Sequence, residues 1–143
     1  MKEFQGEYDH WCFACGKQNP RGLHLEFTIE GEEYVTTFTP GPVHQGYPGI
    51  MHGGIICTLL DEVMGRYLWK QGLTAPTAEL TVRFRRPVPI NEPLQVRGRV
   101  VNRRGRVIEM EASLILLKDQ QVAATATGKF IQIKEGGLTD GQN

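Results

Sequence analysis

The sequence predicts a single α+β domain in which an antiparallel sheet covers one long helix. The first observation is a stretch whose apolar residues recur in doublets every four positions, which places one apolar stripe along a helix. The second is that every later segment up to residue 133 has the pattern of a strand, with short connections between them. Strands joined this way pair antiparallel, and the stripe needs an apolar surface to lie on. The stripe consists of Ile55, Ile56, Leu59, Leu60, Val63, Met64, Tyr67 and Leu68.

Length and composition limit the alternatives. A chain of 143 residues can bury a core within one domain, which we expect to span residues 1–143. Within it we expect a cysteine-containing loop at 10–23, a core at 24–133 and a flexible tail at 135–143. The 16 basic residues balance 16 acidic ones, which argues against a nucleic-acid-binding protein.

The same bulk features indicate where the protein works. The amino-terminal residues lack the apolar run of a signal peptide, and no segment is apolar enough to cross a bilayer, so no membrane partner is expected. Three cysteines are an odd number, which disfavours a disulfide framework. We therefore expect a cytoplasmic protein.

The elements follow in order along the chain. The helix is expected to begin at His52 and end near Lys70, because Gly72 follows as a stop signal. The last strand contains small residues, which suit a strand that passes close to a helix. The strand patterns occupy residues 23–29, 34–39, 77–86, 94–102, 107–117 and 121–133.

The start of the helix carries groups suited to attack on a carbonyl. His52, Gly53 and Gly54 precede the stripe, where backbone N–H groups lack helical partners and can face a developing negative charge. Asp61 and Glu62 follow within the next turns. Because neighbouring residues point about 100° apart around a helix, only one of these carboxylates can face a given substrate. Asp61 is the first candidate for a catalytic base, and Glu62 is the second.

These residues resemble a known family. The motif is His-Gly-Gly with Asp nine residues after the histidine, preceded by Gln-Gly-Tyr-Pro-Gly-Ile-Met and followed by a strand that ends in Arg-Arg-Pro. It is similar to hot-dog fold thioesterases of the 4-hydroxybenzoyl-CoA and phenylacetyl-CoA (PaaI-like) superfamily, over residues 12–133. The resemblance implies a sheet of five to six strands wrapped around one central helix. It also implies an acyl-CoA thioesterase, which releases a free acid and coenzyme A and needs no cofactor.

The resemblance assigns roles to particular residues. Asp61 matches the acidic residue that acts as general base or nucleophile, and Gly53 matches the backbone N–H that polarises the thioester carbonyl. His52 matches a histidine that shapes the pocket. The alternative is that His52 only caps the N-terminus of the helix. Thr77 matches a hydroxyl that orients the water or the carboxylate. Some relatives carry an asparagine at the position of Gly46. In this chain Gln45, beside it, is the candidate to replace the hydrogen bond of that asparagine to the carbonyl.

Distance along the helix predicts a shared site. Gly53 and Asp61 lie eight residues apart, or about 12 Å. Both must come within about 3–4 Å of one thioester group, which two antiparallel helices can achieve and one helix cannot. We therefore expect a homodimer with two shared active sites, and leave open whether dimers pair into a tetramer.

Two arginines are candidates for binding coenzyme A. Strict alternation places Arg83 and Arg85 on the same strand face as Thr77. Arginine grips phosphate groups well, so this face could dock the phosphates of the substrate. The alternative is an ordinary solvated sheet surface.

Cys12 and Cys15 form a C-x-x-C pair in a tight loop. Such a pair can provide half of a zinc site, and His10 and His24 lie near it in the sequence. No second C-x-x-C exists, so we favour two reduced cysteines and expect no metal.

Two other functions remain open at this stage. One is an acyl-CoA-binding or sensor protein without turnover. The other is a hot-dog dehydratase acting on 3-hydroxyacyl thioesters, for which His52 would be the one candidate histidine.

Overall fold

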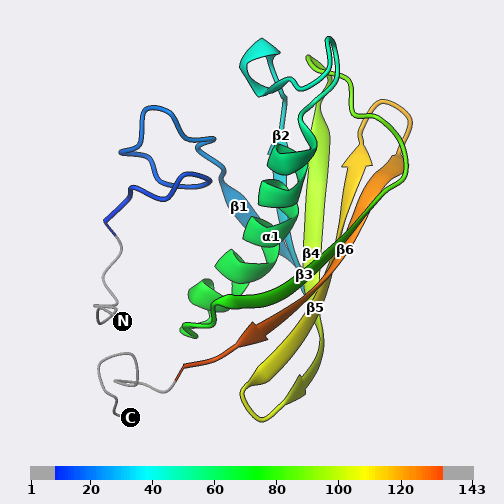
Figure 1. The fold of residues 1–143 in the computed structure, drawn as a ribbon. Coiled ribbons are helices and arrows are strands. Elements are labelled where there is room, and N and C mark those ends of the chain that lie inside the picture. The colour runs from blue at the N-terminus through cyan, green and yellow to red at the C-terminus, as the bar shows by residue number, and fades with distance from the viewer. Residues whose placement is uncertain (1–8, 134–143) are drawn as a thin grey trace.

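One curved sheet holds a single long helix in the computed structural model, which describes residues 9–133 of the chain (Figure 1). Neighbouring strands pair antiparallel in the order β1-β2-β4-β5-β6-β3. The predicted α+β class and the hot-dog arrangement are confirmed. The elements are β1 Phe27–Glu30, β2 Glu33–Phe38, the short helix η1 Pro42–His44, α1 Gly53–Lys70, β3 Thr77–Phe84, β4 Leu94–Arg104, β5 Val107–Leu116 and β6 Gln121–Ile131.

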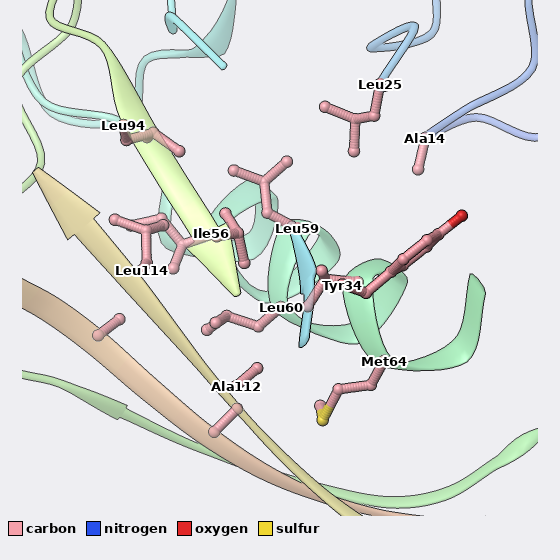
Figure 2. Close-up of a cluster of buried hydrophobic side chains, with 14 of the residues drawn as sticks. Ala14, Leu25, Tyr34, Ile56, Leu59, Leu60, Met64, Leu94, Ala112 and Leu114 are labelled. Atoms are coloured by element: carbon pink, nitrogen blue, oxygen red, sulfur yellow. The ribbon is translucent and has the colours of Figure 1, made fainter. Parts of the chain in front are cut away.

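The apolar stripe of α1 lies on the inner face of the sheet, as the sequence predicted. Leu59, Leu60 and Met64 are fully buried there (Figure 2). Val63 is fully buried as well. Truncating a leucine in such a position to alanine typically costs about 2–5 kcal/mol of stability. Among residues 9–133, no helix combines the length and the apolar character that a membrane span requires. The sheet contributes Leu94, Val96, Ile108, Met110, Leu114 and Phe130 to the same core.

Small residues let the helix approach the sheet closely. A methyl group added at Gly128 on β6 would lie 2.8 Å from the Phe130 ring and 3.1 Å from the end of Met64. One added at Gly98 on β4 would lie 3.0 Å from Val63. Both contacts are tighter than side chains normally make, so a larger residue at either position would force its neighbours in the core to move. The predicted close approach of the last strand is confirmed.

The first predicted strand is wrong in its first half. Residues 23–26 lie outside the sheet, His24 among them has a left-handed backbone with φ 55°, and β1 begins at Phe27. The Leu23 N–H donates to the Phe13 carbonyl at 2.8 Å, and the Leu25 N–H donates to the Ala14 carbonyl at 2.9 Å. Both leucines are buried against the N-terminal loop. The alternation therefore reported which side chains are buried, but it identified neither the backbone conformation nor the partner.

The other strands differ from their predicted ends by one or two residues. The tail predicted at 135–143 and the first eight residues lie outside the described part of the chain.

Candidate active site

His52 caps the start of α1. Its backbone is extended, with φ −63° and ψ 132°, and its Nδ1 accepts a hydrogen bond from the Gly54 N–H at 2.8 Å. The neutral ring must then carry its proton on Nε2, which stays available as a donor. Within residues 9–133 no hydrogen bond reaches the Gly53 N–H. The structure therefore separates the two glycines: Gly54 is used by the cap, and Gly53 presents an orphan donor.

A pocket opens beside this donor. It measures about 370 Å³ and is lined by Gly46, Tyr47, Ile50, Met51, His52 and Gly53. The pocket wall is a turn fixed by Gln45, whose Oε1 accepts from the Gly49 N–H at 2.8 Å. The Gln45 carbonyl is thus engaged within the turn, and its amide nitrogen remains as the donor that could face a ligand. Tyr47 is 83% exposed at the rim.

Asp61 and Thr77 meet at the open side of α1. The Thr77 hydroxyl, on the first residue of β3, donates to Asp61 Oδ1 at 2.7 Å. Hydrogen bonds from a hydroxyl to a carboxylate are among the stronger ones, so the bond holds the carboxylate in one orientation. It leaves Oδ2 available to accept a proton. Thr77 is exposed and Asp61 is half-buried, so the pair lies at the surface of the chain.

A β-bulge makes this contact possible. The pairing of β3 with β6 shifts by one residue between Thr77 and Glu79. Without the shift, Thr77 would share the outer face of β3 with Arg83, as strict alternation predicted. With it, Thr77 turns toward α1 while Arg83 stays on the opposite face. Sequence reasoning missed the bulge, because residues 77–79 contain no glycine and Pro76 before them indicated only the loop that follows α1.

Glu62 faces a different environment from Asp61. Its carboxylate oxygens lie 3.8 and 4.0 Å from the Sγ of Cys12 on the N-terminal loop. Burial beneath this loop raises the pKa of the Glu62 carboxyl, while hydrogen bonding to Cys15 and the charge of Arg66 act in the opposite direction. Of the two candidate carboxylates, only Asp61 contacts Thr77.

Cys57 lies on α1 one turn before Asp61. Burial, and then the negative charge of Asp61, raise the pKa of the Cys57 thiol above its ordinary value. The thiol therefore stays protonated at neutral pH, which makes it a poor nucleophile.

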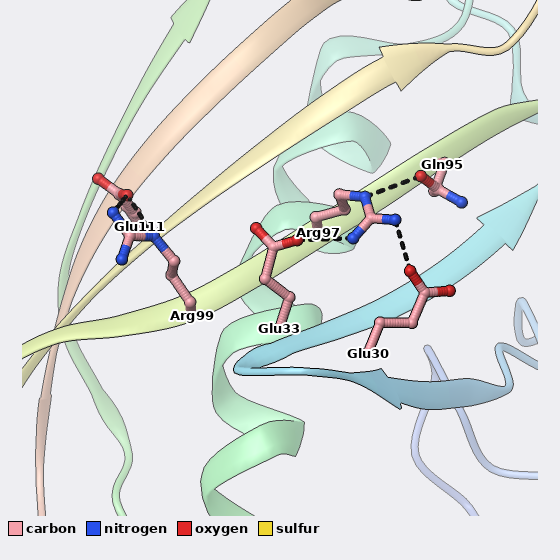
Figure 3. A network of polar contacts seen from close by, with 6 residues as sticks. All are labelled: Glu30, Glu33, Gln95, Arg97, Arg99 and Glu111. Atoms are coloured by element: carbon pink, nitrogen blue, oxygen red, sulfur yellow. Dashed lines mark hydrogen bonds and ion pairs between the residues drawn. The ribbon is translucent and has the colours of Figure 1, made fainter.

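The outer face of the sheet, away from α1, carries a groove of about 480 Å³ lined by several arginines. Arg97 and Arg99 are neutralised there (Figure 3). Arg97 bonds Glu30 and Glu33 at 2.6 Å each, and Arg99 pairs with Glu111 at 2.6 Å.

Arg83 and Arg85 line the same groove, and neither has an ion-pair partner among residues 9–133. They remain candidates for binding phosphate groups. They lie on the opposite face of the sheet from Asp61, so a ligand that touches both must pass around the edge formed by β3.

The chain belongs to the thioesterase superfamily. The model of that family matches residues 48–123, which include α1 and β3 and make up more than half of the chain. The resemblance drawn from the His-Gly-Gly motif is thereby confirmed.

Relatives and solved structures agree. The acyl-coenzyme A thioesterase THEM4 of Bos taurus is 29% identical over 116 residues, covering 78% of this chain and 48% of that protein. The chain thus spans about half the length of the curated relatives it matches. The thioesterase superfamily protein RHA08564 is 29% identical, with a TM-score of 0.79 over 85% of this chain and 60% of that one. The E. coli PaaI protein is 21% identical, with a TM-score of 0.70 over 76% of this chain and 83% of that one.

Two streptococcal structures share the fold and hold ligands. The smu.793 protein of Streptococcus mutans, bound to acetyl CoA, is 20% identical, with a TM-score of 0.71 over 78% of this chain and 90% of that one. A hypothetical thioesterase protein of Streptococcus pneumoniae, with coenzyme A, is 19% identical, with a TM-score of 0.70 over 76% of this chain and 87% of that one.

Proposed function

We propose that this chain hydrolyses an acyl-CoA thioester to a free acid and coenzyme A, at a site shared between two copies. The observation that carries the proposal is the 2.7 Å hydrogen bond that fixes the Asp61 carboxylate against Thr77 at the open side of α1. The curated relatives named acyl-coenzyme A thioesterases, and the related folds bound to acetyl CoA or coenzyme A, support this substrate class.

Asp61 supplies the base. With Oδ1 held by Thr77, Oδ2 takes a proton from a water whose oxygen attacks the thioester carbonyl carbon. The carbonyl oxygen becomes an oxyanion, and the Gly53 N–H donates a hydrogen bond to it. Collapse of the tetrahedral intermediate breaks the carbon–sulfur bond, and the proton on Asp61 passes to the leaving thiolate. Direct attack by Asp61, followed by hydrolysis of the anhydride, uses the same geometry.

A second copy completes the site. Gly53 and Asp61 are about 12 Å apart along one helix, so one substrate must take each group from a different chain. The surface beside them is open, because within residues 9–133 β3 forms one edge of the sheet and pairs with β6 alone. Phe84 at the end of β3 is 55% exposed, and a methyl group at Gly53 would lie 3.6 Å from its ring. This apolar edge suits a homodimer; pairing of dimers into a tetramer stays a prediction.

Release of free thiol from a panel of aromatic and aliphatic acyl-CoAs tests the proposal. We expect Asp61→Asn to lower turnover at least ~100-fold, because the amide cannot accept the proton. Asp119→Asn is the matched control, since it makes the same change on an exposed turn between β5 and β6. We expect it to keep wild-type turnover.

One outcome would overturn the assignment of the base, and two would overturn the proposed hydrolysis. Full activity in Asp61→Asn with loss in Glu62→Gln would move the base to Glu62. Binding of acyl-CoA without thiol release by the wild type would indicate a sensor. Conversion of a 3-hydroxyacyl-CoA to its enoyl product would indicate a dehydratase, although the Nδ1 of His52 is engaged by Gly54.

A further inference from the structure

Three side chains with metal-binding atoms converge beneath the N-terminal loop. The ligand atoms of Cys12, Cys15 and Glu62 all lie within 4.8 Å of one another. Two of them come from the loop, and the third comes from the middle of α1, fifty positions further along the chain. The cluster is separate from the candidate active site, because Glu62 faces the loop while Asp61 faces Thr77.

The spacing fits a tetrahedral ion. With Zn–S bonds of about 2.3 Å and Zn–O bonds of about 2.1 Å, sulfur and oxygen ligands lie about 3.6 Å apart and two sulfurs about 3.8 Å apart. The Cys12 Sγ lies 3.8 and 4.0 Å from the two Glu62 oxygens. The Cys12–Glu62 separation is thus within a few tenths of an ångström of the tetrahedral value, and the other separations in the group are at most 4.8 Å.

The loop is shaped to present both sulfurs together. The Gly16 N–H donates to the Cys12 carbonyl at 2.8 Å and closes a tight turn around the C-x-x-C pair. A methyl group at Gly16 would lie 2.4 Å from the Cys12 nitrogen, so only glycine fits this position. Backbone bonds from Leu23 and Leu25 anchor the loop further.

Charge balance also suits a divalent cation. The deprotonated forms of two thiols and one carboxylate carry three negative charges in a partly buried space, which is costly without a counter-ion. Arg66, one turn further along α1, acts electrostatically on Glu62 and supplies one positive charge. A divalent ion supplies the other two, which brings the filled cluster to neutrality.

We propose that Cys12, Cys15 and Glu62 bind a divalent ion of the zinc type, which fastens the N-terminal loop to α1. Thiolate ligands select soft or borderline ions over magnesium and calcium. The fourth position is left for water. The histidines near the motif in the sequence are not brought in: among residues 9–133 the ligand group contains neither His10 nor His24, and the His24 Nε2 lies 2.6 Å from the Asn19 carbonyl. The sequence favoured reduced cysteines because it contains no second C-x-x-C, whereas the structure provides Glu62 as a third ligand.

Titration of the reduced, metal-free protein with Co²⁺, followed by Zn²⁺, tests the proposal. We expect one equivalent of Co²⁺ to produce a thiolate-to-cobalt charge-transfer band that Zn²⁺ then removes. Cys12→Ser and Cys15→Ser should each weaken Co²⁺ binding at least ~100-fold. This exceeds the usual cost of removing a group that only hydrogen-bonds to a metal ligand. Glu62→Gln should keep the thiolate band and weaken binding about 10–100-fold, because the amide oxygen is a poorer ligand than a carboxylate.

Cys57→Ser is the matched control. It removes the third cysteine, which lies on α1 outside the cluster, and should bind Co²⁺ like the wild type. Zn²⁺ should also raise the melting temperature of the wild type and of Cys57→Ser but not that of Cys12→Ser, since an ion that binds only the folded state stabilises it. The proposal is overturned by a wild type without the band, by a band that persists in both loop variants, or by a band lost in Cys57→Ser.

Discussion

Two neighbouring carboxylates on α1 lie in opposite surroundings. Asp61 points to the open side of the helix, where the Thr77 hydroxyl holds it at 2.7 Å. Glu62 points beneath the N-terminal loop, where it faces the thiols of Cys12 and Cys15. One step along a helix turns the side chain by about 100°, so adjacent acids can serve separate tasks. The sequence ranks them as rivals for one role, whereas the structure gives each its own partners.

The largest loss of activity is expected from a change at Gly53, the first residue of α1. Gly53→Pro removes the orphan N–H, yet proline is well tolerated at the first position of a helix. The preceding residue, His52, already has the extended backbone that a following proline requires. We expect a loss of about 100- to 1000-fold in kcat, as for removal of an oxyanion donor. Circular dichroism would show a retained helix, and unchanged kcat would remove Gly53 from the mechanism.

Thr77→Val tests what holds Asp61 in place. The variant keeps the size of the side chain and removes its hydroxyl, so the carboxylate loses its fixed orientation. A hydrogen bond to a charged group contributes about 1.5–3 kcal/mol, which corresponds to roughly a 10- to 100-fold lower kcat. Thr77→Ser keeps the hydroxyl and should recover most of the rate. Equal losses in both variants would contradict the orienting role.

The arginines of the outer groove test how far the substrate extends. If Arg83 and Arg85 bind the phosphates of coenzyme A, the double alanine variant should raise KM several-fold and leave kcat near the wild-type value. The Arg97 guanidinium, already paired with Glu30 and Glu33, should contribute less to substrate binding. Initial rates across a range of acyl-CoA concentrations separate KM from kcat, and an unchanged KM would make the groove a solvated surface.

The smallest expected effect is a change in the pKa of the Cys57 thiol, which the negative charge of Asp61 helps to raise. Burial is the larger cause of its raised pKa and the Asp61 carboxylate is the smaller one. A nearby negative charge disfavours the thiolate, so Asp61→Asn should lower the pKa of Cys57 but leave it above the ordinary value. The rate of Cys57 alkylation by iodoacetamide, followed by mass spectrometry across pH, should therefore rise at a lower pH in the variant. An unchanged or higher pKa of Cys57 in Asp61→Asn would contradict an electrostatic effect of Asp61 on this thiol.

Local pattern was enough to predict the helix and most of the strands. The spacing of apolar doublets identified the buried face of α1, because a helix repeats its faces every 3.6 residues. The His-Gly-Gly motif and Asp61 were singled out from the residues themselves, and the resemblance to a family added Thr77. The catalytic roles of these residues stay predictions.

Long-range pairing could not be predicted. Residues 23–26 alternate like a strand, but their partner is the loop around Phe13 and Ala14 rather than the sheet. The bulge after Thr77 depends on how β3 meets β6, which no local signal reports. The approach of Glu62 to Cys12 joins positions fifty residues apart, so only the folded chain brings the three metal-binding side chains together.

Two chains are expected to share each active site, and mixing two inactive variants tests this sharing. Asp61→Asn and Gly53→Pro are each expected to lack activity as separate proteins. When the two are unfolded together and refolded in equal amounts, a mixed dimer has one site with both defects and one site with neither. Random pairing then restores about one quarter of the wild-type rate of thiol release. A mixture no more active than its separate components, in which mass spectrometry shows that mixed dimers have formed, would contradict the shared site.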